Sequence, residues 1–122
     1  MNVSLLRTVL CAAFLFSAAN VYAQSAKPPE PVKIGMSTAL TGPYSEFGVM
    51  QRNAVEIAVE QLNAKGGIKG RPIQIVLYDD GLVPARAQAN VRRLIEEDKV
   101  AAIIGPAGSG PNLAVNPLVL AK

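Results

Sequence analysis

Residues 62–80 read LNAKGGIKGRPIQIVLYDD and join the end of a predicted helix to a predicted strand. Gly66-Gly67 mark the helix end, because glycine readily adopts the left-handed conformation that is common there. Residues 72–80 show the two-residue alternation of a strand. The helix itself is predicted over residues 49–65, and its buried face is expected to consist of apolar residues at three- and four-residue spacing. These residues are Val55, Ala58, Val59 and Leu62.

The same alternation of strand and helix continues on both sides of this stretch. The remaining predicted elements are a strand at 32–40, a loop at 41–48, a helix at 84–98, a strand at 100–105 and a helix at 111–122. The apolar strand at 100–105 suits a sheet buried on both faces. Three acids end the helix at 84–98 and oppose its dipole, so we expect that helix to stop early.

This β-α-β-α-β-α order predicts an α/β fold, a three-layer βαβαβα unit around a parallel sheet. The chain ends inside an apolar helical pattern at residues 118–122, with no glycine stop. Three strands and a partial helix leave apolar faces to cover. We therefore expect the chain to be the front part of a longer protein.

Residues 1–23 have the pattern of a cleaved signal peptide, with Arg7 ahead of an apolar block and Val21-Tyr22-Ala23 at the cleavage site. Cleavage is expected after Ala23. Residues 24–31, QSAKPPEP, then form a flexible leader. These features predict an exported, periplasmic protein.

The composition excludes several classes of function. The chain carries 12 Lys and Arg against 9 Asp and Glu, a net charge of +3, and the basic residues are scattered, which argues against nucleic-acid binding. It has no histidine, the commonest metal ligand and general base. Its single cysteine, Cys11, lies in the predicted signal peptide. We therefore expect no metal, no cofactor and no enzymatic activity.

Ligands of parallel α/β sheets bind beyond the carboxyl ends of the strands, which here means the loops at 41–48 and 106–111. The second loop lies in IIGPAGSGPN, residues 103–112. Its glycine spacing matches neither a P-loop nor a dinucleotide fingerprint. Backbone N–H groups and the Ser109 hydroxyl could hold a small carboxylate there. A simple helix start, capped by Ser109 or Asn112, explains the residues equally well.

Asp79-Asp80 end the second predicted strand and suggest metal binding or acid–base chemistry. Neighbouring residues of a strand point to opposite faces, however, so the two carboxylates cannot chelate one ion together without a kink. We therefore predict a structural role for this pair.

Three stretches in this order resemble the first part of the periplasmic solute-binding proteins of ABC transporters, in the leucine/isoleucine/valine-binding group. They read VKIGMSTALTGPYSEFG, LNAKGGIKGRPIQIVLYDD and AAIIGPAGSG. The resemblance runs from Lys33 to the end of the chain. It implies a type I periplasmic binding fold in which two lobes close over a ligand, and it assigns residues 32–122 to an incomplete first lobe.

The resemblance also implies a ligand site. In such proteins the loop after the third strand grips a carboxylate through a serine and backbone amides, and the first loop supplies a bulky aromatic residue. Ser109 matches the serine, with Ala107 and Gly108 lining the same loop, and Phe47 matches the aromatic residue. Tyr44 lies in the same first loop, where a surface role explains it equally well, and Thr41 fits the turn that shapes this edge. In the family, the Asp79-Asp80 pair closes its strand and holds the next loop.

Two positions depart from the family pattern. Some relatives join the loops after the second and third strands by a disulfide, but Leu82 and Gly108 stand there in this chain. Val83 replaces the aspartate that often caps the second helix. Both changes put the rigidity of these loops in doubt.

The sequence thus predicts the solute-binding component of an ABC importer, a monomer when complete. It would capture a branched-chain amino acid or a similar carboxylate or amide for a membrane permease. A ligand-sensing regulatory domain of the same fold and a nucleotide-binding fragment of an α/β enzyme are the alternatives.

Overall fold

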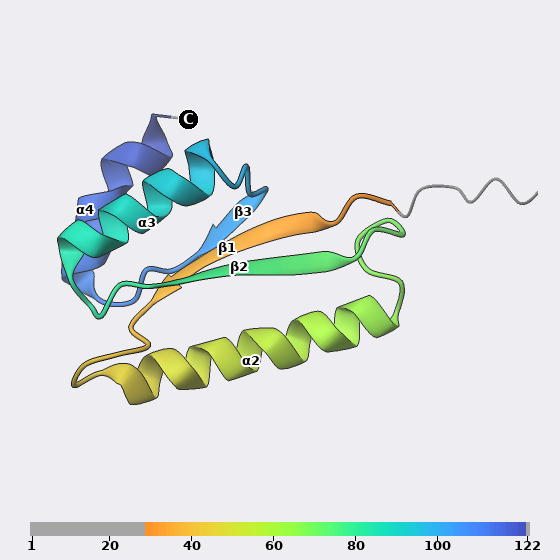
Figure 1. Cartoon of the computed structure of the whole chain (residues 1–122), viewed down its shortest axis with the longest axis horizontal. Helices are drawn as coiled ribbons and strands as arrows, with labels where there is room; N and C mark the ends of the chain where they lie inside the picture. Colours follow the sequence, from red (N-terminus) through yellow and green to blue (C-terminus); the bar gives the residue numbers. More distant parts are fainter. Residues whose placement is uncertain (1–28, 122) are drawn as a thin grey trace, which may run out of the picture.

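The computed structural model describes residues 29–121, in which three strands alternate with three helices (Figure 1). The elements are β1 (Val32–Thr38), α2 (Ser45–Ala64), β2 (Ile73–Asp79), α3 (Pro84–Glu96), β3 (Ala102–Ile104) and α4 (Ser109–Leu120). The predicted signal peptide and residues 24–28 of the leader lie outside the described residues. Within residues 29–121, no helix combines the length and hydrophobicity needed to cross a bilayer.

The three strands form one parallel sheet in the order β2-β1-β3. β1 pairs with β2 over its whole length, from Val32 opposite Ile73 to Thr38 opposite Asp79. Its other side pairs with β3, from Ile34 opposite Ala102. Helix α2 covers one face of the sheet, and α3 and α4 lie together on the other (Figure 1). The predicted three-layer α/β fold with a parallel sheet is confirmed.

Helix α3 is held against the sheet by the buried face that its sequence pattern predicts. Ala87, Val91 and Leu94 are fully buried. Leu94 packs directly on β1 at Gly35, where a Cβ atom would lie 2.8 Å from the Leu94 methyl groups. The helix ends at Glu96, before the three-acid run is complete, as predicted. Val83, its N-cap residue, provides no side-chain cap, also as predicted.

Two predicted helix starts are wrong, by four residues in α2 and by two in α4. Helix α2 begins at Ser45 rather than at residue 49, because the turn in which Ser45 N donates to Gly42 O (3.1 Å) runs straight into the helix. Helix α4 begins at Ser109 rather than at residue 111. Phe47 and Ser109 therefore belong to first helical turns and not to loops. The end of α2 agrees with prediction, since Gly66 and Gly67 both adopt positive φ angles.

Two predictions of burial are also wrong for the described part of the chain. Leu62, predicted to face the core from α2, is 47% exposed, and Ala58 is exposed as well. The strand predicted at 100–105 shrinks to Ala102–Ile104, and Ile104 is 40% exposed. The exposure of β3 follows from its position, because it pairs with β1 on one side and forms an edge of the described sheet on the other.

Candidate functional site

A hollow lies at the carboxyl end of the sheet, between the start of α2 and the loops that follow β2 and β3. It consists of two adjoining pockets of about 290 and 240 Å³, which share Gln51 and Ala107. We call them together the crevice. The first is lined by Ala39, Tyr44, Phe47, Gly48, Gln51, Leu82, Ala107 and Gly108. The second is lined by Met36, Gln51, Ala54, Val55, Ile104, Gly105, Pro106 and Ala107.

The topology explains why the sheet opens here. From β1 the chain crosses to β2 on one side, and from β2 it crosses back to β3 on the other side of β1. The connections after β1 and β3 therefore lead to opposite faces of the sheet, to α2 and to α4 (Figure 1). Such a reversal in strand order is the usual position of a ligand crevice in parallel α/β sheets.

Close backbone approaches fix both walls of the crevice. A Cβ atom at Gly48 would lie 1.8 Å from the carbonyl oxygen of Ala39, so α2 can approach the end of β1 only through a glycine. A Cβ atom at Gly105 would lie 2.3 Å from the carbonyl oxygen of Ser37. These two contacts hold α2 and the β3–α4 loop against β1 from its two sides.

The start of α4 presents backbone donors beside this loop. Gly108 is the N-cap residue, with a φ angle of 82°, and its carbonyl accepts the first helical hydrogen bond from Asn112 N (3.1 Å). The first N–H groups of a helix have no partners within it. Pro111 has no N–H, so the groups that remain belong to Gly108, Ser109 and Gly110. Together with the positive end of the helix dipole they suit an anion.

The structure does not support the helix-cap interpretation of Ser109 and Asn112. Gly108 occupies the N-cap position, and no side chain makes a capping hydrogen bond at this helix start. Asn112 instead donates from Nδ2 to the carbonyl oxygens of Pro106 (2.7 Å) and Gly108 (2.9 Å). These two hydrogen bonds tie the β3–α4 loop to the first turn of α4. The exposed Ser109 side chain extends from the first helical position.

The six predicted site residues fall into three groups. Tyr44, Phe47, Ala107 and Gly108 line the larger pocket. Ser109 directly follows Gly108 at the start of α4. Thr41 lines neither pocket, and its hydroxyl donates to Asp79 Oδ2 (2.6 Å). The structure thus brings four of the residues together, sets Ser109 next to them, and engages Thr41 in a separate contact.

The Asp79 carboxylate holds the turn after β1. It accepts hydrogen bonds from the Thr41 hydroxyl and from the backbone N–H groups of Leu40 (2.7 Å), Thr41 (3.2 Å) and Gly81 (3.0 Å). Partial burial raises the pKa of Asp79, but these hydrogen bonds outweigh it and lower the pKa below its ordinary value. A carboxylate with this many donors is a structural anchor.

Asp80 points to the opposite side and is fully buried. Its carboxylate accepts from the Ser37 hydroxyl (2.8 Å) and from the backbone N–H of Leu82 (2.8 Å). Asn90 of α3 completes the network by donating to Ser37 Oγ (3.3 Å) and to the Asp79 carbonyl (3.1 Å). The structural role predicted for the aspartate pair is confirmed. Among residues 29–121, no cluster of acidic, histidine or cysteine side chains could hold a metal ion.

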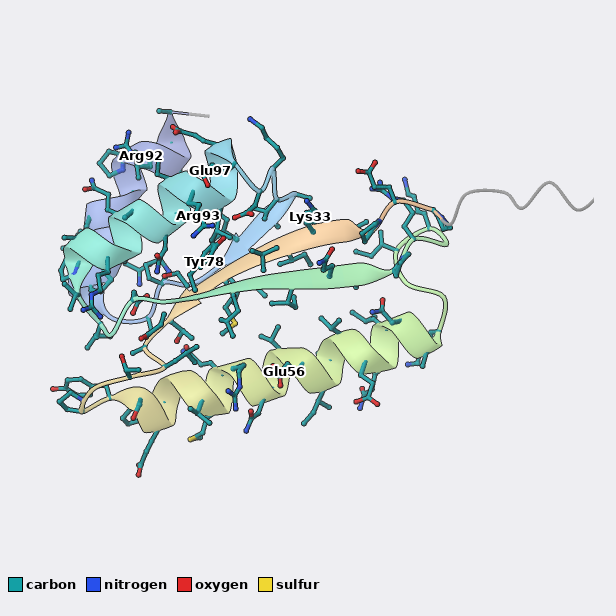
Figure 2. All side chains as sticks on the ribbon, viewed as in Figure 1. Lys33, Glu56, Tyr78, Arg92, Arg93 and Glu97 are labelled. Carbon is teal, nitrogen blue, oxygen red and sulfur yellow. The ribbon has the colours of Figure 1, made fainter. Side chains whose placement is uncertain are left out.

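The basic pair Arg92-Arg93 lies on α3, away from the crevice. Figure 2 shows Arg93 and Tyr78 directed toward each other from α3 and β2. The Arg93 guanidinium lies 4.8 Å from the centre of the Tyr78 ring, and its Nε is 3.2 Å from Glu97 Oε2. Arg93 therefore takes part in packing α3 on the sheet.

A third hollow, of about 260 Å³, lies at the amino ends of the strands and is bordered by Lys33, Arg71, Asp98 and Lys99. Its charges are of both signs. Arg71 donates to the carbonyl oxygens of Glu30 (2.7 Å) and Pro31 (3.4 Å), and Lys33 to that of Asp98 (3.4 Å). Side chains of the chain itself thus satisfy local backbone groups there.

Sequence reasoning missed Gln51 as a residue of the site. Its position was a usable signal, because it lies one helical turn after Phe47 and therefore on the same face of α2. The contact that makes it notable, a hydrogen bond from the buried Thr38 hydroxyl to Gln51 Oε1 (2.7 Å), depends on how α2 docks on β1.

Comparisons of the sequence and of the structure with known proteins point to the same family. Residues 31–122 match the family described as periplasmic binding protein. The Leu/Ile/Val-binding protein of Escherichia coli (strain K12) is 38% identical over 76 residues, which cover 62% of this chain and 20% of that protein. The chain spans about a fifth of the length of that relative.

Solved structures agree with the sequence comparison. A periplasmic binding protein type 1 from Bordetella pertussis Tohama I is 57% identical, with a TM-score of 0.72, over 75% of this chain and 25% of its own. The branched-chain amino acid transporter substrate binding protein LivJ from Streptococcus pneumoniae, solved in complex with isoleucine, is 30% identical, also with a TM-score of 0.72. That match covers 75% of this chain and 26% of the LivJ chain.

Proposed function

The chain belongs to the periplasmic binding protein family, and we propose that it captures a small carboxylate in the crevice for an ABC importer. The observation that carries this proposal is the start of α4, whose N-cap residue Gly108 lines a pocket at the strand-order reversal of the sheet. Charge and geometry both suit a carboxylate there.

In this proposal the carboxylate accepts hydrogen bonds from the Ser109 hydroxyl and from the backbone N–H groups of Ser109 and Gly110. Phe47 and Tyr44 cover the apolar part of the ligand from the start of α2. Both aromatic side chains are largely exposed in this chain, at 65% and 53%, and so are available for such contacts. Thr41 acts indirectly, by fixing the turn through Asp79.

The wider role that we propose for the complete protein is the one that its family suggests. We propose that residues 1–23 direct export to the periplasm and that residues 32–122 form the first part of a ligand-binding lobe. A second lobe would close over the bound ligand, a shift in population toward the closed state. The loaded protein would then deliver its ligand to a membrane permease. Its relatives are binding proteins, and the proposal is binding without chemistry.

Calorimetric titration of the full-length protein tests this proposal. The first probes are L-isoleucine, which the Streptococcus pneumoniae relative binds, and 2-methylbutylamine, which has the same carbon skeleton without the carboxylate. A panel of small aliphatic and aromatic acids extends the search. We expect at least one acid to bind and its amine counterpart not to bind. Binding that does not depend on the carboxylate would contradict the proposal.

A further inference from the structure

We propose that Gln51 is a specificity-determining residue of the crevice, and that it selects small carboxylates that carry a further acceptor oxygen outside the carboxylate group. This inference rests on the proposed function and extends it to the part of the ligand beyond its carboxylate. It concerns a side chain that neither the sequence pattern nor the predicted site includes.

The first observation is the anchoring of the Gln51 amide. Thr38 is the last residue of β1 and is fully buried, and its hydroxyl donates to Gln51 Oε1 over 2.7 Å. A glutamine amide has one oxygen acceptor and an NH₂ group with two donors. Holding the oxygen against Thr38 directs the NH₂ group away from the sheet.

The second observation is where Gln51 lies. Gln51 lines both pockets of the crevice, and within residues 29–121 Ala107 of the β3–α4 loop is the only other residue that borders both. Gln51 therefore stands at the junction of the two pockets. Its backbone is fixed as well, because the neighbouring turn of α2 is locked against Ala39 through Gly48.

The chemistry of the remaining lining decides which ligand group this donor recognises. Among the described residues, neither pocket is lined by an Asp, Glu, Lys or Arg side chain. The polar side chains that line the crevice are those of Gln51, whose NH₂ group is a donor, and Tyr44, whose hydroxyl can donate or accept. A second oxygen on the ligand satisfies the Gln51 donor, whereas a methylene leaves it without an acceptor once water is excluded.

Matched pairs of acids test this assignment. The probes are 4-methyl-2-oxopentanoate with 4-methylpentanoate, 4-oxopentanoate with pentanoate, and 4-hydroxybenzoate with benzoate. Within each pair the acids differ only by one oxygen, near or far from the carboxylate. We expect the wild-type protein to bind the oxygenated member of at least one pair about tenfold more tightly, the value of one good hydrogen bond.

The key variant is Gln51→Glu, which keeps an oxygen for Thr38 and replaces the NH₂ donor by a second oxygen. It should lose the preference within the pair while melting at the wild-type temperature. Gln51→Met provides a second, uncharged variant that should also lose the preference, but it should melt at a lower temperature because the buried Thr38 hydroxyl loses its acceptor. Thr38→Val should weaken the preference, because the amide is then no longer oriented. Gln61→Glu, on the same helix but outside the lining of both pockets, is the matched control and should keep the preference.

The outcomes separate the two proposals. A wild-type protein that binds acids without an oxygen preference, or a preference that survives in Gln51→Glu and Gln51→Met, overturns the role of Gln51 and leaves carboxylate capture intact. Failure of the wild-type protein to bind any acid overturns carboxylate capture, and the role of Gln51 with it.

Discussion

The carboxyl edge of the sheet has two halves that use polar groups in opposite ways. In the β1–β2 half, Asp79 and Asp80 direct their oxygens to the chain's own donors in the adjoining turns. In the β1–β3 half, Gly105 brings the backbone close to the Ser37 carbonyl, and the donors at the start of α4 have no partner within the helix. One half is thus a closed structural network, and the other is suited to an external acceptor.

Carboxylates near a strand end therefore need not mark the half of a sheet that binds a ligand. The aspartate pair attracts attention in the sequence, yet its hydrogen bonds are already used within the fold. The small residues of the other half leave space and expose main-chain donors. Substitutions should therefore separate the two halves, with stability lost in one and ligand affinity lost in the other.

The largest effect should follow from a change that disrupts both halves together. In Gly48→Val the new side chain would meet the Ala39 carbonyl, whose oxygen lies 1.8 Å from an ideal Cβ position. We expect a loss of more than about 3 kcal/mol in unfolding free energy, as for other severe steric conflicts, or failure to fold. Chemical denaturation of the purified protein measures it.

Gly110→Ala is the control for that experiment. A Cβ atom there meets only Pro84 Cγ at 3.5 Å, an ordinary contact, and alanine favours the helix. Its unfolding free energy should equal or exceed that of the wild type. Equal stability of Gly48→Val and the wild type would show that α2 does not dock on β1 as described.

The next largest effect should be confined to the β1–β2 half. Asp80→Ala leaves the buried Ser37 hydroxyl and the Leu82 N–H without their acceptor, which should cost about 2–3 kcal/mol of unfolding free energy. The ligand affinity of the folded fraction should change much less. Urea denaturation and calorimetry on the same preparation give both values. A variant that keeps its stability but loses its ligand would reverse the roles of the two halves.

The complementary change lies in the β1–β3 half. Ser109→Ala should weaken ligand binding by about 1–3 kcal/mol, the range for one hydrogen bond to a charged group. Its unfolding free energy should stay at the wild-type value, because the Ser109 side chain makes no capping hydrogen bond. Ser45→Ala, at the start of α2, is a matched serine control for ligand binding. Unchanged affinity in Ser109→Ala would remove this hydroxyl from the site.

The smallest effect concerns the response to acid. The folded pKa of Asp79 lies below its ordinary value of 3.8, because hydrogen bonds from Thr41 and neighbouring backbone outweigh the opposing effect of burial. A lowered folded pKa contributes stability that is fully present above the unfolded pKa and is lost as the pH falls through the folded value. Stability should therefore decline below about pH 4, and less steeply in Asp79→Asn.

Thermal unfolding between neutral pH and pH 3 measures this dependence for both proteins. Asp79→Asn should be the less stable of the two at neutral pH, and the difference should shrink in acid. A constant difference across this range would mean that the Asp79 charge does not hold the turn.

Much of the fold could be predicted because the local and global patterns agree. The helical stripe of α3, the glycine stop after α2 and the alternation of strand and helix each depend on short-range spacing. The starts of α2 and α4 could not be placed, because turn geometry at Gly42 and Gly108 decides them. The burial of Leu62 and of β3 was predicted wrongly, because burial depends on neighbours that the described chain does not supply.

The candidate site was predictable in part and for a physical reason. Strand order places the loops after β1 and β3 at one edge, so residues from both regions, such as Phe47 and Ala107, meet in one pocket. The contact of Thr41 with Asp79 and the role of Gln51 depend on side-chain directions across elements. No periodicity in a single sequence specifies those directions.

The most direct test of carboxylate capture in the crevice is a crystal structure of the full-length protein with the tightest-binding acid of the panel. We predict that the carboxylate lies within hydrogen-bond distance of the Ser109 hydroxyl and the Gly110 N–H, between α2 and the β3–α4 loop. A ligand bound instead in the hollow at the amino ends of the strands, beside Lys33 and Arg71, would contradict the account.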